Sequence, residues 1–202
     1  MPRLEFFYDL SSPWTRIAFR NAQALVEETG AEFILRPILV GGVFNAVNQS
    51  VYAMREDLNN PKFRLTWHWL KEWADLAGVA MNFPSPHHPL KSVNAMRFCC
   101  AVEDDQAVLA RFSEAAFEAY FGEQANLDDV AELVKVADKV GLDGGALATR
   151  IQDQDVKDRL RFNTQEVIDR GGFGSPTLFV NETRMYFGND QLPLVRQALL
   201  NG

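Results

Sequence analysis

Cysteine is scarce in this sequence. The 202 residues include only two, Cys99 and Cys100, and they are neighbours. Adjacent residues rarely pair in a structural disulfide, because the bridge favours a Cα separation of about 5.5 Å whereas neighbours lie about 3.8 Å apart. They also lack the spacing of metal ligands. We therefore expect two buried, reduced thiols, which favours a cytoplasmic location and argues against a disulfide-stabilised scaffold.

Basic residues and long apolar segments are also scarce. Lys and Arg number 20 against 27 Asp and Glu, which gives a net charge of -7 and a pI near 5.0. Nucleic-acid binding needs many basic side chains facing phosphates, so we expect no such partner. No stretch approaches the roughly 18 apolar residues of a membrane span, and the first ten residues do not resemble a signal peptide. The three histidines show no metal-ligand pattern, so no metal is expected.

What remains is an ordinary globular composition, with 47% apolar and 23% charged residues. The apolar run Leu4–Tyr8 predicts a buried strand. Ser12 and Pro13 are a preferred cap and first residue of a helix, which should stop near Gly30. Residues 32–40 predict a second strand, with a proline that indicates a bulge or an edge position. This order is one right-handed βαβ unit.

The middle of the chain, from about residue 45 to residue 170, contains no convincing strand pattern. Helical spacing predicts a helix over 62–76, others capped by Ser92 and by Asp128 or Asp129, one through Val108 and Tyr120, and a long segment over 143–170. The proline-rich stretch 78–91 is typical of a loop. This block is expected to be entirely helical.

Sheet character returns after the glycine-rich residues 171–174. Residues 177–180 and 184–187 predict a hairpin, and 191–200 a terminal helix. The whole predicts an α/β fold: a thioredoxin-like four-stranded sheet with a large all-helical insertion. We assign residues 1–44 plus 156–202 to the thioredoxin-like domain and 45–155 to the helical insertion domain.

Chemistry is expected at the first strand–helix junction, where a helix N-terminus offers free N–H groups and partial positive charge. Thioredoxin-like folds carry C-x-x-C there, whereas this chain has Ser12-Pro13-Trp14-Thr15. Dithiol–disulfide exchange therefore cannot occur at this site. No evident histidine and acid accompany the serine, which argues against a serine hydrolase. From the residues alone, a role as a helix cap explains Ser12 as well as a chemical role does.

Several segments together resemble the 2-hydroxychromene-2-carboxylate isomerases and kappa-class glutathione transferases, which are DsbA-like thioredoxin-fold proteins. The resemblance spans nearly the whole chain and rests on FFYDLSSPWTRIAF (6–19), RPILVGGVFNAVNQ (36–49), Pro61-Lys62, parts of 83–97, GGFGSPTLFV (171–180) and FGNDQLPLV (187–195). It implies an enzyme that uses glutathione as its cofactor. It also implies a homodimer, an aromatic small-molecule substrate and a role in aromatic catabolism.

The resemblance assigns roles to particular residues. Ser12 would donate a hydrogen bond to the glutathione thiol as the catalytic residue. Ser175 would offer its backbone to the cysteinyl part, ahead of a cis-proline, Pro176. Asn189 and Asp190 would hold the γ-glutamyl end, although from the residues alone this pair is typical of a helix cap.

The helical insertion would contribute Lys62, which resembles a family lysine near the glycyl carboxylate, and Asn48. Departures from the family pattern include Ser175 for an apolar residue and Gln191 for an arginine. Arg97 matches a family arginine that could form a structural salt bridge or contact a substrate carboxylate. His87 and His88 could line a pocket mouth, and the tryptophans of 67–73 are interpreted as core.

Three functions stay open. The first is a glutathione-dependent isomerase of an aromatic pyruvate-type substrate, in which reversible thiolate addition would let a carbon–carbon bond rotate before elimination. The second is a kappa-like transferase, in which the thiolate stays attached to the electrophile. The third is a non-catalytic DsbA-like binding or chaperone-like protein that has lost C-x-x-C.

Overall fold

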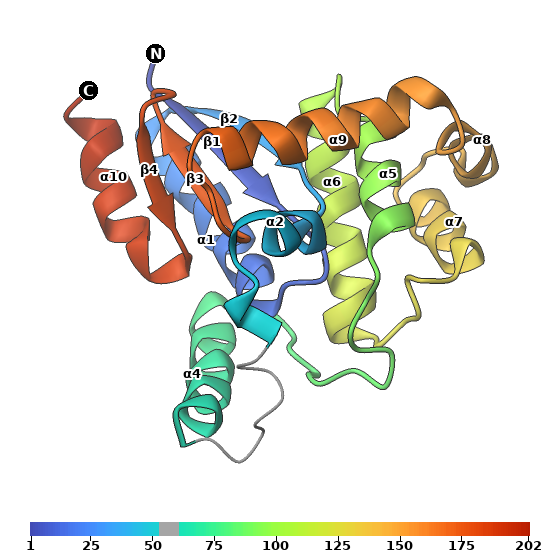
Figure 1. The fold of residues 1–202 in the computed structure, drawn as a ribbon, viewed down its shortest axis with the longest axis horizontal. Coiled ribbons are helices and arrows are strands. Elements are labelled where there is room, and N and C mark those ends of the chain that lie inside the picture. The colour runs from blue at the N-terminus through green and yellow to red at the C-terminus, as the bar shows by residue number, and fades with distance from the viewer. Residues whose placement is uncertain (53–60) are drawn as a thin grey trace.

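The structure is a computed structural model that describes residues 1–52 and 61–202. A twisted sheet lies at its centre, with helices on both faces and most of the remaining helices at one end (Figure 1). In chain order the elements are β1 (Arg3–Tyr8), α1 (Pro13–Thr29), β2 (Glu32–Pro37), α2 (Val40–Val47), α4 (Pro61–Ala77), α5 (Val93–Ala101), α6 (Gln106–Phe117), the π-helical turn η1 (Glu118–Gly122), α7 (Val130–Lys139), α8 (Gly144–Arg150), α9 (Gln154–Asp169), β3 (Thr177–Val180), β4 (Arg184–Phe187), the 3₁₀ turn η2 (Asn189–Gln191) and α10 (Leu192–Leu200).

The strand order in the sheet is β2-β1-β3-β4. β1 runs parallel to β2 and antiparallel to β3, so Phe6 lies between Leu35 and Leu178. The hairpin turn between β3 and β4 has positive φ at Asn181 and Glu182, as a tight turn between right-twisted strands requires. The predicted four-stranded thioredoxin-like sheet with a large helical insertion is confirmed. The division into two domains at the residues given above stays a prediction.

Each face of the sheet has its own core, because alternate residues of β1 point to opposite sides. Phe6 and Tyr8 join the larger cluster, where both rings lie about 6.0 Å from that of Phe19 on α1. Phe7 faces the other way and packs with Phe179 beneath α9 and α2. Every residue of β1 after Arg3 is therefore buried, which explains why the strand is apolar apart from Glu5.

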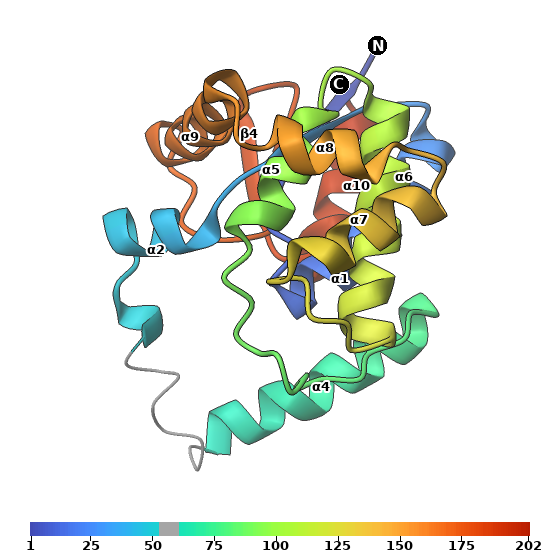
Figure 2. The same cartoon turned by 90° about the vertical axis from the view of Figure 1, so that its right-hand side faces the viewer.

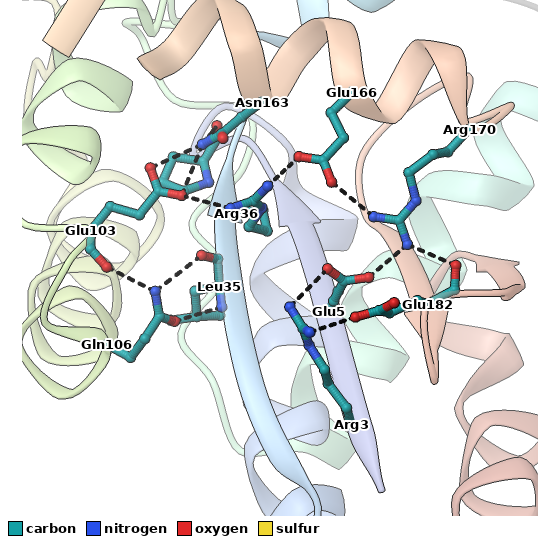
Figure 3. A network of polar contacts seen from close by, with 11 residues as sticks. Arg3, Glu5, Leu35, Arg36, Glu103, Gln106, Asn163, Glu166, Arg170 and Glu182 are labelled. Carbon is teal, nitrogen blue, oxygen red and sulfur yellow. Dashed lines mark hydrogen bonds and ion pairs between the residues drawn. The ribbon is translucent and has the colours of Figure 1, made fainter. Parts of the chain in front are cut away.

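A network of polar contacts attaches α9 to the sheet (Figure 3). Arg170, at the end of α9, pairs with the buried Glu5 at 2.6 Å and stacks 3.7 Å from the ring centre of Phe179. At the other end of the network, the buried Glu103 accepts two hydrogen bonds from Asn163, at 2.9 and 3.0 Å. Each buried carboxylate has a partner, as burial of a charge requires.

The structure corrects one sequence prediction and refines another. The second strand was expected to reach Val40, but it ends at Pro37, and the N–H of Val40 instead donates to Asp9 Oδ2 at 2.8 Å as α2 begins. Ser92 stands at the N-cap of α5 as expected, but its side chain makes no capping bond and instead donates to Asp9 Oδ2 at 3.0 Å. In both cases a buried carboxylate more than 30 residues away accepts the bond, a partner that local sequence cannot reveal.

The expectation of two buried, free thiols is confirmed. Cys99 and Cys100 are free and buried, and burial raises the pKa of the Cys99 thiol to about 12 and that of Cys100 further. None of the described helices combines the length and apolar character that a membrane crossing needs. The described side chains also form no cluster of His, Cys, Asp or Glu suited to a metal ion.

Candidate functional site

The first turn of α1 is built around Ser12. Its backbone is extended, and its Oγ accepts a hydrogen bond from the N–H of Thr15 at 3.2 Å. Pro13 follows at the first helical position, where a missing N–H costs nothing. The predicted helix cap is therefore confirmed, and it places the Ser12 hydroxyl at the positive end of a 17-residue helix.

The loop before β3 meets this helix end from the other side. The peptide bond between Ser175 and Pro176 is cis, as the resemblance implies. The hydroxyl of Ser12 donates to the carbonyl oxygen of Ser175 over a long 3.3 Å. The side chain of Ser175 points back into the protein, where its Oγ accepts from the N–H of Asp9 at 2.9 Å and lies 2.8 Å from Thr15 Oγ1.

Asp9 organises the backbone beneath the site. Its side chain is fully buried and accepts hydrogen bonds from the N–H of Ser11, the N–H of Val40 and the hydroxyl of Ser92, at 2.8 to 3.0 Å. Burial raises the pKa of this carboxyl, and the hydrogen bonds from Ser11, Val40 and Ser92 oppose the rise. One residue thus joins the end of β1 to the starts of α2 and α5.

A cavity of about 620 Å³ opens beside Ser12 and Ser175. This is the size of a small-molecule site. The residues that line it are Ser11, Ser12, Pro13, Trp14, Val40, Phe44, Thr66, Trp67, Leu70, Phe83, Pro84, His88, Pro89 and Ser175. The polar part of the lining lies mainly at the start of α1 and in the cis-proline loop, whereas most of the wall is apolar and aromatic. Such a cavity can hold a flat apolar group against a polar end.

Helix α4 provides the far wall of the cavity. It lies apart from the sheet and beneath the rest of the molecule in Figure 2, where the chain leading to α5 passes close to it. Leu70 packs on Ile17 of α1 within a small separate core. The ring of Trp67 stacks on that of Phe83 at a centroid distance of 4.8 Å and an angle of 14°. An aromatic surface is therefore held between α4 and the loop over 78–92.

Of the predicted site residues, the structure brings Ser12 and Ser175 together at the cavity, with Pro176 next in the chain. Asn48 lies at the end of α2, where its Nδ2 donates to the carbonyl oxygen of Phe173 at 3.0 Å. It therefore ties α2 to the loop that leads into the cis-proline. Lys62 is an exposed residue in the first turn of α4 and is not part of the cavity lining.

Asn189 and Asp190 differ sharply in exposure. Asn189 is 3% exposed and accepts a hydrogen bond from Asn21 on α1 at 2.8 Å, while its own Nδ2 has no partner among the described residues. Asp190 is exposed and accepts from the side chain of Gln191 at 2.9 Å. Both precede α10, but neither lines the cavity.

Sequence reasoning missed most of the aromatic wall. Trp67 was interpreted as core, yet it lines the cavity, and Trp69 is 47% exposed. Trp73 does pack in the core between α4 and α1. Helical spacing alone does not separate the residues of α4 that face the core from those that face the cavity, because this depends on how α4 packs on its neighbours. The proposal that His88 could line a pocket mouth is confirmed in position, whereas His87 is not part of the lining. Arg97 has a buried Nε without a hydrogen-bond partner among the described residues.

The model of the DSBA-like thioredoxin domain matches residues 3–200. The chain belongs to this family. The 2-hydroxychromene-2-carboxylate isomerase of Sphingobium xenophagum is 27% identical over 98% of this chain and 98% of its own length. Glutathione S-transferase kappa 1 of Rattus norvegicus is 27% identical over 97% and 90%.

A solved structure of a 2-hydroxychromene-2-carboxylate isomerase superposes with a TM-score of 0.78, at 23% identity over 97% of this chain and 93% of that one. This likeness confirms the fold. The resemblance to the isomerases and kappa-class transferases is likewise confirmed, and these DsbA-like relatives are named as enzymes.

Proposed function

We propose that this protein is a glutathione-dependent isomerase of an aromatic pyruvate-type substrate. The observation that carries the proposal is the meeting of the Ser12 hydroxyl, the N-terminus of α1 and the carbonyl of Ser175 at the polar end of an aromatic cavity. Bound glutathione would supply a nucleophilic thiol there. The names of the relatives support both the cofactor and the type of reaction.

The donor set of the site fits this cofactor. The bond from Ser12 to the Ser175 carbonyl is long for an O–H donor, so it is weak and easily exchanged. A backbone N–H of a peptide-like ligand can take the place of Ser12 on that carbonyl, as an added strand would. The Ser12 O–H is then released and can turn towards a sulfur atom in the cavity.

The energy required is within reach of these groups. A thiol with an ordinary pKa of about 8.5 is about 3% ionised at pH 7, and lowering that pKa to about 6.5 requires roughly 2.7 kcal/mol. A hydrogen bond to a charged acceptor contributes about 1.5–3 kcal/mol. A helix N-terminus adds about 0.3–1 kcal/mol. Ser12 at the start of α1 would thus supply the whole shift without acting as a nucleophile itself.

Asn48, Lys62, Asn189 and Asp190 complete the proposed glutathione site. Asn48 bonds to the loop over 171–176, and Ser175 of that loop is bonded to Asp9, so this loop would position the cysteinyl part. Lys62 would meet the glycyl carboxylate, and the segment before α10 would receive the γ-glutamyl end. Since Asn189 is buried and bonded to Asn21, it would hold this segment against α1, and the exposed Asp190 would meet the ammonium group.

Product analysis separates the isomerase from its alternatives. The enzyme is incubated with 2-hydroxychromene-2-carboxylate and a stoichiometric amount of glutathione. An isomerised product with all glutathione recovered supports the proposal, whereas a stable thioether would favour a kappa-like transferase. Failure to bind glutathione at millimolar concentration would favour a non-catalytic DsbA-like protein. The homodimer, the cytoplasmic location and the role in aromatic catabolism stay predictions.

A further inference from the structure

The aromatic wall of the cavity includes a segment that has no regular secondary structure. Residues 78–92 form neither helix nor strand, yet Phe83, Pro84 and Pro89 of this segment line the cavity beside Trp67. The Trp67 ring belongs to α4 and stacks on Phe83 at 4.8 Å between ring centres. A flat surface made of two rings binds a ligand well only if both rings are held in place. The contacts that hold Phe83 therefore matter for binding.

The end of the π-helical turn η1 provides an anchor for this segment. A helix end leaves carbonyl oxygens without partners inside the helix. Here the carbonyl oxygen of Phe121 accepts from the backbone N–H of Asn82 at 2.7 Å, and that of Gly122 accepts from Asn82 Nδ2 at 2.5 Å. In return, Nε2 of Gln124 donates to the carbonyl oxygen of Asn82 at 3.0 Å. The backbone and the side-chain amide of Asn82 are thus both bonded to the chain that follows α6.

This anchor acts directly on the aromatic ring, because Asn82 immediately precedes Phe83. The Phe83 ring also packs against Phe121 of η1, at 5.9 Å between ring centres. Farther along the segment, the hydroxyl of Tyr120 in the same turn donates to the carbonyl oxygen of His87 at 3.3 Å. The turn therefore holds the segment at two separate points.

The same turn is also tied to the beginning of α1. Arg16 is only 2% exposed, and its guanidinium pairs with Glu118 of η1 at 2.5 Å and with Glu114 of α6 at 3.2 Å. The backbone N–H of Arg16 donates to the carbonyl oxygen of Ser12 at 3.2 Å. One buried side chain thus sets η1, and with it the aromatic wall, against the helix end that carries Ser12.

We propose that Asn82 is the positioning residue of the acceptor side of the cavity: by anchoring Phe83 to η1, it gives the site a preference for flat aromatic ligands over saturated ligands of the same skeleton. This inference rests on the proposed function, since it concerns the substrate side of the same site. Asn82 is exposed and is not part of the cavity lining, so it acts through Phe83. A saturated ring has no π-face and cannot stack on an aromatic one.

The test compares 2-naphthol with decahydro-2-naphthol, which has the same carbon skeleton but no flat face. Binding is measured by titration calorimetry for the wild type, Asn82→Asp and Gln124→Glu. Each substitution keeps the shape of the side chain but replaces the amide donor by an oxygen that repels the carbonyl it faces. The matched control, Asp143→Ala, removes another exposed hydrogen bond, from the N–H of Ala146 at the start of α8, outside the cavity lining.

We expect the wild type to bind 2-naphthol about fivefold more tightly than its saturated analogue, which is the order of magnitude that aromatic stacking contributes. In Asn82→Asp and Gln124→Glu this preference should fall below about twofold, whereas Asp143→Ala should keep it. All these proteins should give the same thiolate absorbance when glutathione is added, because Ser12 is unchanged. A substitution that only loosened the fold would not separate these two measurements.

A preference for 2-naphthol that survives in either amide variant, or that the wild type never shows, would overturn the inference. It would also be overturned if Asp143→Ala reduced the preference equally, or if the amide variants lost the thiolate absorbance together with the preference. Absence of thiolate absorbance from the wild type would instead count against the proposed function. The naphthol comparison would still decide the role of Asn82 in that case.

Discussion

The side chain of Ser175 offers a sharp test of how the cis-proline loop is held. Ser175→Ala removes a hydroxyl that bonds to the N–H of Asp9 at 2.9 Å and to Thr15 Oγ1 at 2.8 Å. Asp9 and Thr15 are both fully buried, so neither group can turn to water instead. A buried polar group left unsatisfied costs about 1–3 kcal/mol, so two such groups should lower the free energy of unfolding by about 2–6 kcal/mol.

Urea unfolding followed by tryptophan fluorescence measures this loss. Thr15→Val provides the comparison, since it removes one partner of Ser175 while the bond from the N–H of Asp9 to Ser175 Oγ remains, and it should cost about 1 kcal/mol. In the double variant the shared bond is counted once, so the loss should be smaller than the sum of the single losses. An unfolding free energy of Ser175→Ala within about 0.5 kcal/mol of the wild type would refute this reasoning.

Two further predictions concern buried titratable groups. Burial raises the pKa of Asp9 above its ordinary value of 3.8. The protonated carboxyl therefore contributes fully to the free energy of unfolding below pH 3.8, and this contribution is lost as the pH rises through the pKa of the folded state. The stability difference between wild type and Asp9→Asn should therefore narrow with rising pH in urea titrations, and a widening difference would contradict the assignment. Because burial raises the pKa of Cys99 to about 12, and that of Cys100 further, a maleimide should label neither thiol until the protein unfolds; rapid labelling of native protein would count against it.

The sheet was predictable because each strand can be recognised from its own short segment of sequence. The apolar run of β1 is buried on both faces, and the breakers around β3 and β4 bound a short hairpin. The end of β2 was not predictable, since the N–H of Val40 is taken by the distant Asp9. The same holds for Ser92, whose backbone is left-handed and whose hydroxyl bonds the same carboxylate.

The site was predictable at its polar end only. Ser12 carries a local signal, a preferred cap before proline, and the resemblance added Ser175 and its cis bond. The aromatic wall has no such signal, because Trp67 faces the cavity only by virtue of how α4 packs against α1. Which aromatic residues are core and which are lining depends on that docking.

The central claim is that Ser12 activates the thiol of bound glutathione. The most direct measurement is the ultraviolet absorbance of the thiolate as glutathione is added at neutral pH to the wild type, Ser12→Ala and Ser12→Thr. A matched control is Asp129→Ala, which removes the cap of α7 at the N–H of Ala131 and should cost a similar amount of stability, about 1 kcal/mol.

We expect a thiolate signal in the wild type, in Ser12→Thr and in Asp129→Ala, and its loss in Ser12→Ala. A two-unit rise in the thiol pKa would reduce the thiolate at pH 7 from about three-quarters to about 3%. A signal that persists in Ser12→Ala, or that never appears in the wild type, would contradict the claim.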